Sequence, residues 1–221
     1  MGTDSPRAYR SSRREAQART TRRRVVEAAT AVFLERGFAG ATMRAIAGRA
    51  GVSVPTVELA FGTKAQVLKA AIDVAIAGDD EPVPVLERGW TDAAVSAATV
   101  GEFLDVVSDV LGSAQERSAG LVLAVFEAAA TTPELAGLAE QMTAQRVATA
   151  AWIVDQLASL GAVSGGFTRQ EAVDTVWILM DPAVFDRLTR RRQWTRSHYQ
   201  RWFAHSLVRL LTGGSTTSDS L

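Results

Sequence analysis

Side chains that can bind phosphate oxygens are concentrated between positions 41 and 64 of the 221-residue chain. Within this stretch, Thr42 and Ser53 supply hydroxyl groups, Arg44 a guanidinium and Lys64 an ammonium. Groups of these kinds contact the sugar-phosphate backbone of DNA and fix the position of a protein on the duplex. We therefore predict that this stretch holds nucleic acid by its phosphates.

A second set of side chains in the same stretch is suited to reading bases. A helix predicted at 53–61 turns these side chains outward: Val54, Pro55, Thr56, Glu58 and Leu59. The set holds no Arg, Lys, Asn or Gln, so hydrogen bonds to base edges must be few. We expect apolar contacts with thymine methyl groups, together with readout of the shape of the DNA.

Two short helices joined by a tight corner must position both sets. Helical patterns at 42–50 and 53–61 are separated by Gly51-Val52-Ser53, which is short enough to force the two helices to pack against each other. Ser53 can cap the second helix, and Pro55 falls in its first turn, where a missing N–H is tolerated. The spacing therefore predicts a helix-turn-helix.

Glu58 is the unusual member of the outward set, because a carboxylate is repelled by phosphate. Two hypotheses follow. Glu58 either enters the groove and accepts a hydrogen bond from cytosine N4, or lowers the affinity for all DNA sequences.

Charge is unevenly distributed along a chain whose formal net charge is zero. Residues 1–70 hold 13 basic and 5 acidic residues, and the remainder holds 11 basic and 19 acidic residues. A basic end fits a polyanion, and we add Arg22 and Arg24 to the expected phosphate contacts. Residues 1–18, rich in Arg and Ser, are either a solvated tail or an arm that follows DNA.

Composition excludes several other classes of protein. The chain has no cysteine, which excludes disulfides and thiolate chemistry and fits a cytoplasmic location. No apolar run reaches the roughly 18 residues of a membrane span. An acidic stretch at 78–84 lacks the pattern of a calcium loop, so we expect no metal and no cofactor.

The remainder of the chain reads as helices, and the predicted fold is all-α. Helical patterns follow at 20–37, 64–77, 99–111, 119–130, 132–160, 168–180 and 195–211. Thr63 with Gln66, Thr99 with Glu102 and Thr168 with Glu171 are spaced as capping boxes at three of these starts.

The segment 22–70 resembles the DNA-binding head of the TetR family of bacterial transcriptional regulators. The residues that carry the resemblance are Ala28, Ala29, Phe33, Gly37, Phe38, Thr42, Ile46, Ala47, Ala50, Gly51, Val52, Ser53, Thr56, Phe61 and Lys64. The family usually has tyrosine where this chain has Glu58. The sequence at 177–202 is similar to C-terminal domains of the family, with fewer matching positions.

The resemblance implies a homodimer of roughly nine or ten helices per subunit, with a small-molecule site in the body. We predict a flexible basic arm at 1–18, a helix-turn-helix head at 19–77, an effector-binding and dimerisation domain at 78–213 and a disordered tail at 214–221.

Two late helices carry apolar stripes that a second subunit could cover or that could be core. The residues of these stripes are Val173, Val176, Met180, Tyr199, Trp202, Phe203, Leu207 and Leu210. Candidates for the effector site are Phe103, Phe126, Met142, Arg146, Trp152 and Trp177, with the alternative that the apolar ones are core. Arg146 either extends to solvent or anchors an anionic effector.

Three classes of function remain, and double-stranded DNA is the partner in the first two. A ligand-released repressor that binds a palindromic operator as a homodimer is favoured. A DNA-organising protein without an effector is the alternative. An enzyme is disfavoured, because His198 and His205 are the only histidines and no paired acid accompanies them.

Overall fold

The computed structural model describes residues 6–79, 81, 85–164 and 166–211. These residues form helices and no strand, which confirms the predicted all-α fold. The elements are α1 (Pro6–Gly40), α2 (Met43–Ala50), α3 (Val54–Phe61), α4 (Lys64–Ala77), η1 (Val85–Glu87), α5 (Gly89–Val95), α6 (Val100–Ala129), α7 (Pro133–Ser159), α8 (Arg169–Leu179), α9 (Pro182–Asp186), η2 (Arg187–Arg191) and α10 (Arg196–Leu211). None of the helices in these ranges is long and apolar enough to cross a membrane.

Helix starts follow the predicted capping chemistry closely. All three predicted capping boxes form, at the starts of α4, α6 and α8. Thr42 and Ser53 accept backbone hydrogen bonds at the starts of α2 and α3. Thr132 precedes α7 without such a bond, and Pro133 supplies the preset backbone of the first turn there.

Two predictions of local structure were wrong. Helix α1 begins at Pro6, whereas its helical pattern was predicted to begin near residue 20; Ala, Arg, Gln and Glu in this stretch favour helix. The patterns at 99–111 and 119–130 belong to one helix, α6. Gly112 lies inside this continuous helix, at a place where α10 approaches closely: a Cβ there would lie 2.6 Å from Gln200 Cγ of α10. The tail predicted at 214–221 lies outside the described residues.

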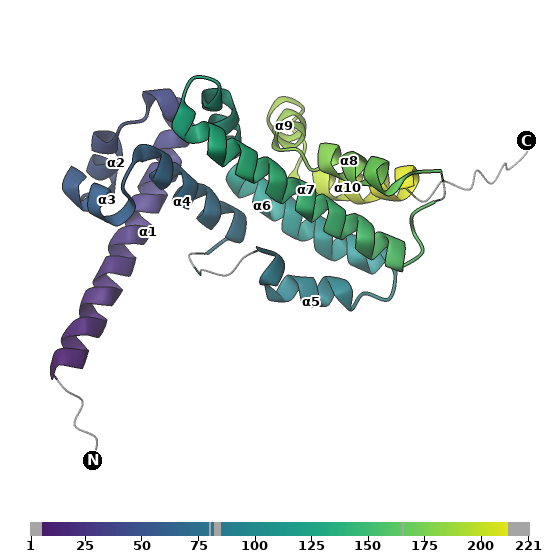
Figure 1. Ribbon diagram of the computed structural model, residues 1–221, viewed down its shortest axis with the longest axis horizontal. Coiled ribbons are helices and arrows are strands. Elements are labelled where there is room, and N and C mark those ends of the chain that lie inside the picture. Colours follow the sequence, from purple (N-terminus) through teal and green to yellow (C-terminus); the bar gives the residue numbers. More distant parts are fainter. Residues whose placement is uncertain (1–5, 80, 82–84, 165, 212–221) are drawn as a thin grey trace, which may run out of the picture.

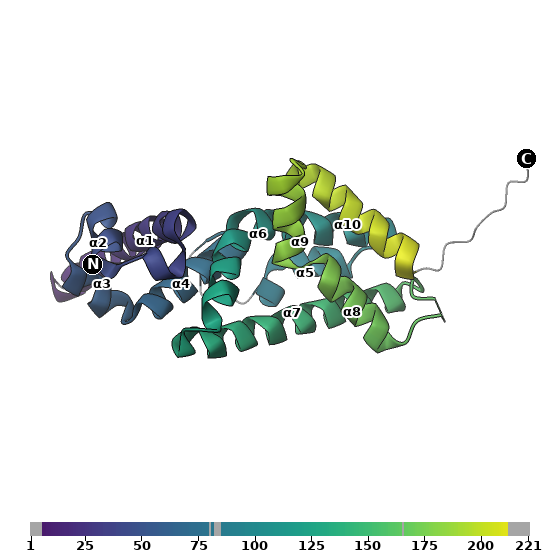
Figure 2. The ribbon, with the colours of Figure 1, turned by 90° about the horizontal axis from the view of Figure 1, so that it is seen from above.

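The long helices α6 and α7 lie side by side and form the spine of the body (Figure 1). The first four helices gather at one end of this spine, where α1 and α4 pack against α6. Seen from above, α8 and α10 extend along the other end of this spine, and α9 lies nearer its middle (Figure 2). Helices α2 and α3 therefore lie at one end of an elongated molecule (Figure 1).

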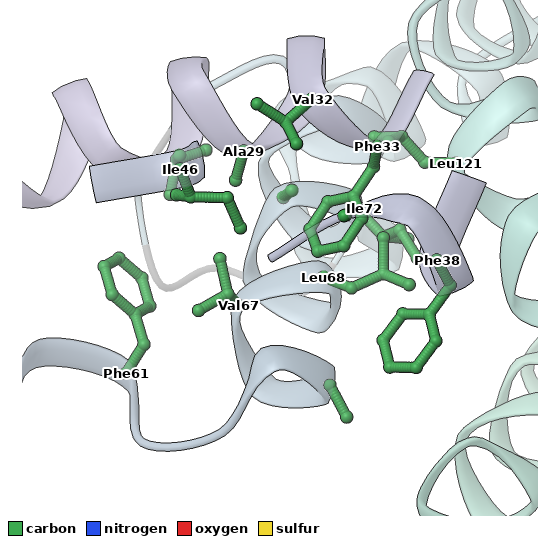
Figure 3. Close-up of a cluster of buried hydrophobic side chains, with 14 of the residues drawn as sticks. Ala29, Val32, Phe33, Phe38, Ile46, Phe61, Val67, Leu68, Ile72 and Leu121 are labelled. Carbon is green, nitrogen blue, oxygen red and sulfur yellow. The ribbon is translucent and has the colours of Figure 1, made fainter. Parts of the chain in front are cut away.

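The apolar interior divides into two clusters that meet within α6. The proximal core joins α1 to α4 with Leu121, Val122 and Val125 of α6 and Leu135, Ala139 and Met142 of α7. Figure 3 shows Leu121 among its side chains with Phe33 and Leu68. The distal core lies among α5 to α10 and includes Phe103, Ile153, Val176, Tyr199 and Phe203. The first four helices thus share their core with one end of the body.

Candidate nucleic-acid interface

The corner between α2 and α3 is fixed by backbone hydrogen bonds that only glycine accommodates easily. Gly51 has a φ of 64°, and the amides of Gly51 and Val52 donate to Gly48 O and Ala47 O at 3.2 and 3.0 Å. This is the Schellman arrangement of a helix C-terminus. A Cβ at Gly51 would also lie 2.8 Å from Arg24 Nη2. The corner therefore holds α3 at a set angle to α2.

The predicted reading face of α3 is open to solvent. Leu59 is 91% exposed, and Pro55 and Glu58 are also exposed. Val54 and Thr56 are half-buried, and the Thr56 hydroxyl pairs with that of Ser53 at 2.7 Å. Val57 and Phe61, on the opposite side of this eight-residue helix, enter the proximal core. One face of α3 is thus anchored while the other is free to enter a groove.

Arg22 and Arg24 lie where they satisfy the C-termini of the two short helices. Arg22 Nη1 donates to Ala60 O of α3 at 3.0 Å, and its guanidinium lies 4.3 Å from the centre of the Phe61 ring. Arg24 Nη2 donates to Ala50 O of α2 at 2.6 Å. A cation at a helix C-terminus also interacts favourably with the helix dipole. Both arginines hold the helix-turn-helix against α1, a role that the sequence analysis did not predict.

Lys64 is held in the same manner at the start of α4. Its Nζ donates to Phe38 O at 2.7 Å and to Ala41 O at 3.0 Å, and it lies 4.1 Å from the centre of the Phe38 ring. Burial lowers the pKa of Lys64, and the charge of Glu134 opposes this shift. Two of the three ammonium donors are thereby used inside the protein.

Arg44 is the predicted phosphate contact that the fold leaves most available. Its side chain is exposed on α2, as are the hydroxyl-bearing residues Thr42 and Ser53 at the starts of α2 and α3. Since Arg22, Arg24 and Lys64 already bind carbonyl oxygens, Arg44 is the basic residue of the set best placed to bind a phosphate. Phosphate binding by Thr42, Arg44 and Ser53 stays a prediction, whereas phosphate binding by Arg22, Arg24 and Lys64, which is also untested, would compete with their bonds to carbonyl oxygens.

The six residues predicted to line an effector site lie in three places. Met142 belongs to the proximal core, against which Phe126 packs. Phe103 contacts Trp152 in the distal core, with ring centres 5.9 Å apart. Arg146 lies against Trp177, 4.9 Å from the ring centre. Two surface hollows of about 350 Å³ each border α10, and none of these six residues lines either one.

Arg146 takes part in a set of hydrogen bonds that closes the C-terminus of α8. Its Nη2 donates to Trp177 O at 3.0 Å and forms an ion pair with Asp181 at 2.7 Å. Tyr199 of α10 donates to Leu179 O at 3.1 Å, and Gln115 of α6 donates to Met180 O at 2.7 Å. We call the side chains of Arg146, Asp181, Tyr199 and Gln115 the α8 closure. Burial raises the pKa of the Tyr199 hydroxyl, which donates the bond to Leu179 O.

Gln115 was missed by the sequence analysis, although its sequence position carries a signal. It is a buried polar residue on the inward stripe of α6, where apolar side chains are expected. A buried amide needs a partner, and a free helix C-terminus supplies one.

The predicted dimer interface needs correction. Six of its eight residues are buried within the single subunit, so no partner can cover them: Val173, Val176, Met180, Tyr199, Phe203 and Leu207. Their apolar stripe is core, the alternative left open by the sequence. Trp202 is half-buried and Leu210 is 44% exposed, and Ile178 on α8, 54% exposed, was not predicted.

Comparison with known proteins identifies the head. Residues 25–71 match the model of the bacterial regulatory proteins of the tetR family. A search of curated proteins returned no match. The fold is similar to that of FadR from Bacillus subtilis in complex with stearoyl-CoA, with 19% identity over 84% of this chain and 96% of that chain and a TM-score of 0.65.

Two further solved structures share the fold. FadR from Bacillus halodurans is 17% identical over 85% of this chain and 94% of that chain, with a TM-score of 0.63. A TetR-family regulator from Syntrophomonas wolfei is 10% identical over 91% of this chain and 99% of that chain, with a TM-score of 0.68. The chain therefore has the DNA-binding domain and the all-helical fold of a TetR-family transcriptional regulator.

Proposed function

We propose that this regulator is a cytoplasmic repressor that binds a palindromic operator as a homodimer and is released by a small molecule. The observation that carries the proposal is the exposed face of α3, with Leu59 at its centre. An exposed leucine on a short, anchored helix is suited to thymine methyl groups in the major groove. The exposed Glu58 beside it has no side-chain hydrogen bond or ion pair with other described residues, so its carboxylate is available to a base.

Dimerisation is supported by the small size of the reading face. One eight-residue helix contacts only a few base pairs, and two heads one helical turn apart, about 34–36 Å, read a longer site. On the body, Ile178 of α8 and Val208 and Leu210 of α10 are exposed apolar side chains, and Trp202 of α10 is half-buried, so a second subunit could cover all four. They replace the buried residues as the proposed interface.

Release by a small molecule is supported by the way the head joins the body. Arg117 of α6 donates from Nε to Ala75 O and from Nη2 to Ile76 O, at 2.7 and 3.1 Å, and so caps the C-terminus of α4. The proximal core continues from α1 and α4 into α6 and α7. A ligand that shifts α6 in the body would therefore also move the head, and it would release DNA if it favoured the shifted state.

The test is selection of DNA by the purified full chain from a random duplex pool, followed by challenge of the complex with a metabolite panel that includes stearoyl-CoA. We expect inverted half-sites about one turn apart, two chains per site, and release by at least one compound. Failure to enrich any sequence would refute specific binding, and one chain per site would refute the dimer. Many dispersed genomic sites with no releasing compound would favour the DNA-organising alternative.

A further inference from the structure

Two buried N–H groups at the contact of α7 with α8 lack an acceptor. Arg146 Nε and Trp177 Nε1 are both buried, and neither has a hydrogen-bond partner among the described residues. They belong to side chains in direct contact, since the Arg146 guanidinium lies over the Trp177 ring. Folded proteins pair nearly all buried N–H groups, so two unpaired donors side by side call for a common explanation.

The rest of this cluster is already satisfied. Asp181 uses both carboxylate oxygens: Oδ1 accepts from the amide of Ala183 at 2.7 Å, and Oδ2 pairs with Arg146 at 2.7 Å. The Arg146 and Asp181 side chains are 14% and 28% exposed, so water screens this pair only partly. The charge of Arg146 is thus balanced within the protein, and Asp181 would repel a second anion at this place.

We propose that Arg146 Nε and Trp177 Nε1 bind an uncharged oxygen acceptor, such as a ketone, ester or amide carbonyl, on an otherwise apolar effector. This inference rests on the proposed function, since it names the chemical class of the releasing ligand. The part of the Trp177 indole that the Arg146 guanidinium does not cover supplies apolar contact, and the two donors select for the oxygen. An uncharged effector thus replaces the anionic effector that the sequence suggested from Arg146 alone.

The position of this site connects ligand binding to the packing of the body. The same guanidinium that presents Nε also holds Trp177 O and Asp181 through Nη2. An acceptor that draws the guanidinium toward itself must adjust the α8 closure, to which Gln115 of α6 and Tyr199 of α10 also contribute. Helix α6 leads to the head, and α10 carries part of the proposed dimer surface.

The experiment follows the indole N–H resonances of the five tryptophans in the 15N-labelled full chain, with Trp177 assigned by its loss in Trp177→Phe. The probes are cyclohexanone, methylcyclohexane and cyclohexanecarboxylate, which share a ring and differ in their acceptor. We expect cyclohexanone to shift the Trp177 resonance downfield and to bind more tightly than the other two. Trp177→Phe and Arg146→Lys should each weaken cyclohexanone binding by about 3- to 10-fold, the cost of one hydrogen bond.

Trp194→Phe is the matched control, because its indole stacks on His198 of α10 and the Arg146 guanidinium stacks on Trp177, and it should leave cyclohexanone binding unchanged. An unmoved Trp177 resonance, equal binding of all three probes, preference for the carboxylate, or unchanged affinity in Trp177→Phe would each overturn the inference. The Trp177→Phe and wild-type measurements suffice if Arg146→Lys does not fold. DNA selection on the same preparation separates the two ideas: ketone binding without DNA binding would refute the proposed function alone.

Discussion

The carbonyl groups at helix C-termini are bound by exposed side chains beside the proximal core and by buried side chains in the distal core. Beside the proximal core, Arg22 and Arg24 reach the C-termini of α3 and α2 from exposed positions. In the distal core, the buried side chains of Gln115 and Tyr199 close α8 from within. An exposed arginine that loses its carbonyl is rehydrated, whereas a buried donor is left unpaired at greater cost. The hydrogen bonds that support the head can therefore be exchanged for water at little cost. The buried donors of the body need another acceptor, such as a ligand oxygen, if their bonds are broken.

The largest losses of stability should come from removing one large buried side chain from each core. Phe33→Ala in the proximal core and Phe103→Ala in the distal core should each lower the free energy of unfolding by about 3–5 kcal/mol, because both rings are fully buried. Urea denaturation measures this loss. At temperatures where both variants are folded, Phe33→Ala should weaken DNA binding more, because α3 and α4 rest on the proximal core. Equal losses of DNA affinity in the two variants would show that the proximal core does not support DNA binding more than the distal core does.

Glu58→Gln should act on DNA recognition without acting on either core. Its side chain is exposed, so the unfolding free energy should change by less than about 0.5 kcal/mol. If Glu58 reads cytosine, the variant loses about 1–3 kcal/mol of discrimination at one base position. If Glu58 weakens binding generally, the variant binds all sequences more tightly. Glu140→Gln, an exposed carboxylate on α7, is the control, and no change in DNA binding by Glu58→Gln would refute both hypotheses.

Arg24 and Arg44 form a matched pair that separates support of the head from phosphate binding. Arg24→Gln should lower the unfolding free energy by about 1 kcal/mol, since it removes the bond to Ala50 O. Arg44→Gln should leave stability unchanged and make the slope of log affinity against log salt shallower by about 0.9 per subunit. Titrations of operator DNA at several salt concentrations measure this slope. A shallower slope for Arg24→Gln would place Arg24 on a phosphate instead.

The smallest effect is expected at the junction of the two regions, where Asp79 pairs with Arg88 at 2.6 Å. The hydrogen bond from Arg88 lowers the pKa of Asp79 from 3.8 to about 2. Because the folded value is the lower one, the pair stabilises the protein above about pH 3.8, and this stabilisation is lost as the pH falls through about 2. NMR titration of the Asp79 carboxyl should show the low pKa, and Arg88→Gln should raise this pKa toward its ordinary value, while the backbone hydrogen bond from Glu81 continues to lower it. A carboxyl that titrates near 3.8 in the unmodified chain would contradict the pairing.

Local signals in the sequence predicted the helix-turn-helix and the starts of α4, α6 and α8. Thr63, Thr99 and Thr168 define their helix starts through bonds to residues three positions later, so spacing alone identifies them. The corner at Gly51 is local for the same reason.

Contacts between distant segments could not be read from spacing. The helices predicted at 99–111 and 119–130 are one helix, in which Gly112 lies against α10, and Arg22, which was predicted to bind phosphate, also donates to Ala60 O of α3. An apolar stripe such as that of Val176 and Phe203 predicts burial but does not say whether the same subunit or a partner provides it.

The most direct test of the account is the structure of the full chain bound to its selected DNA. We predict that α3 lies in the major groove with Leu59 against a thymine methyl group, that Arg44 binds a phosphate, and that Arg22 and Arg24 remain on Ala60 O and Ala50 O. A complex in which α3 stays clear of the groove, with Arg22 and Arg24 moved onto phosphates, would contradict it.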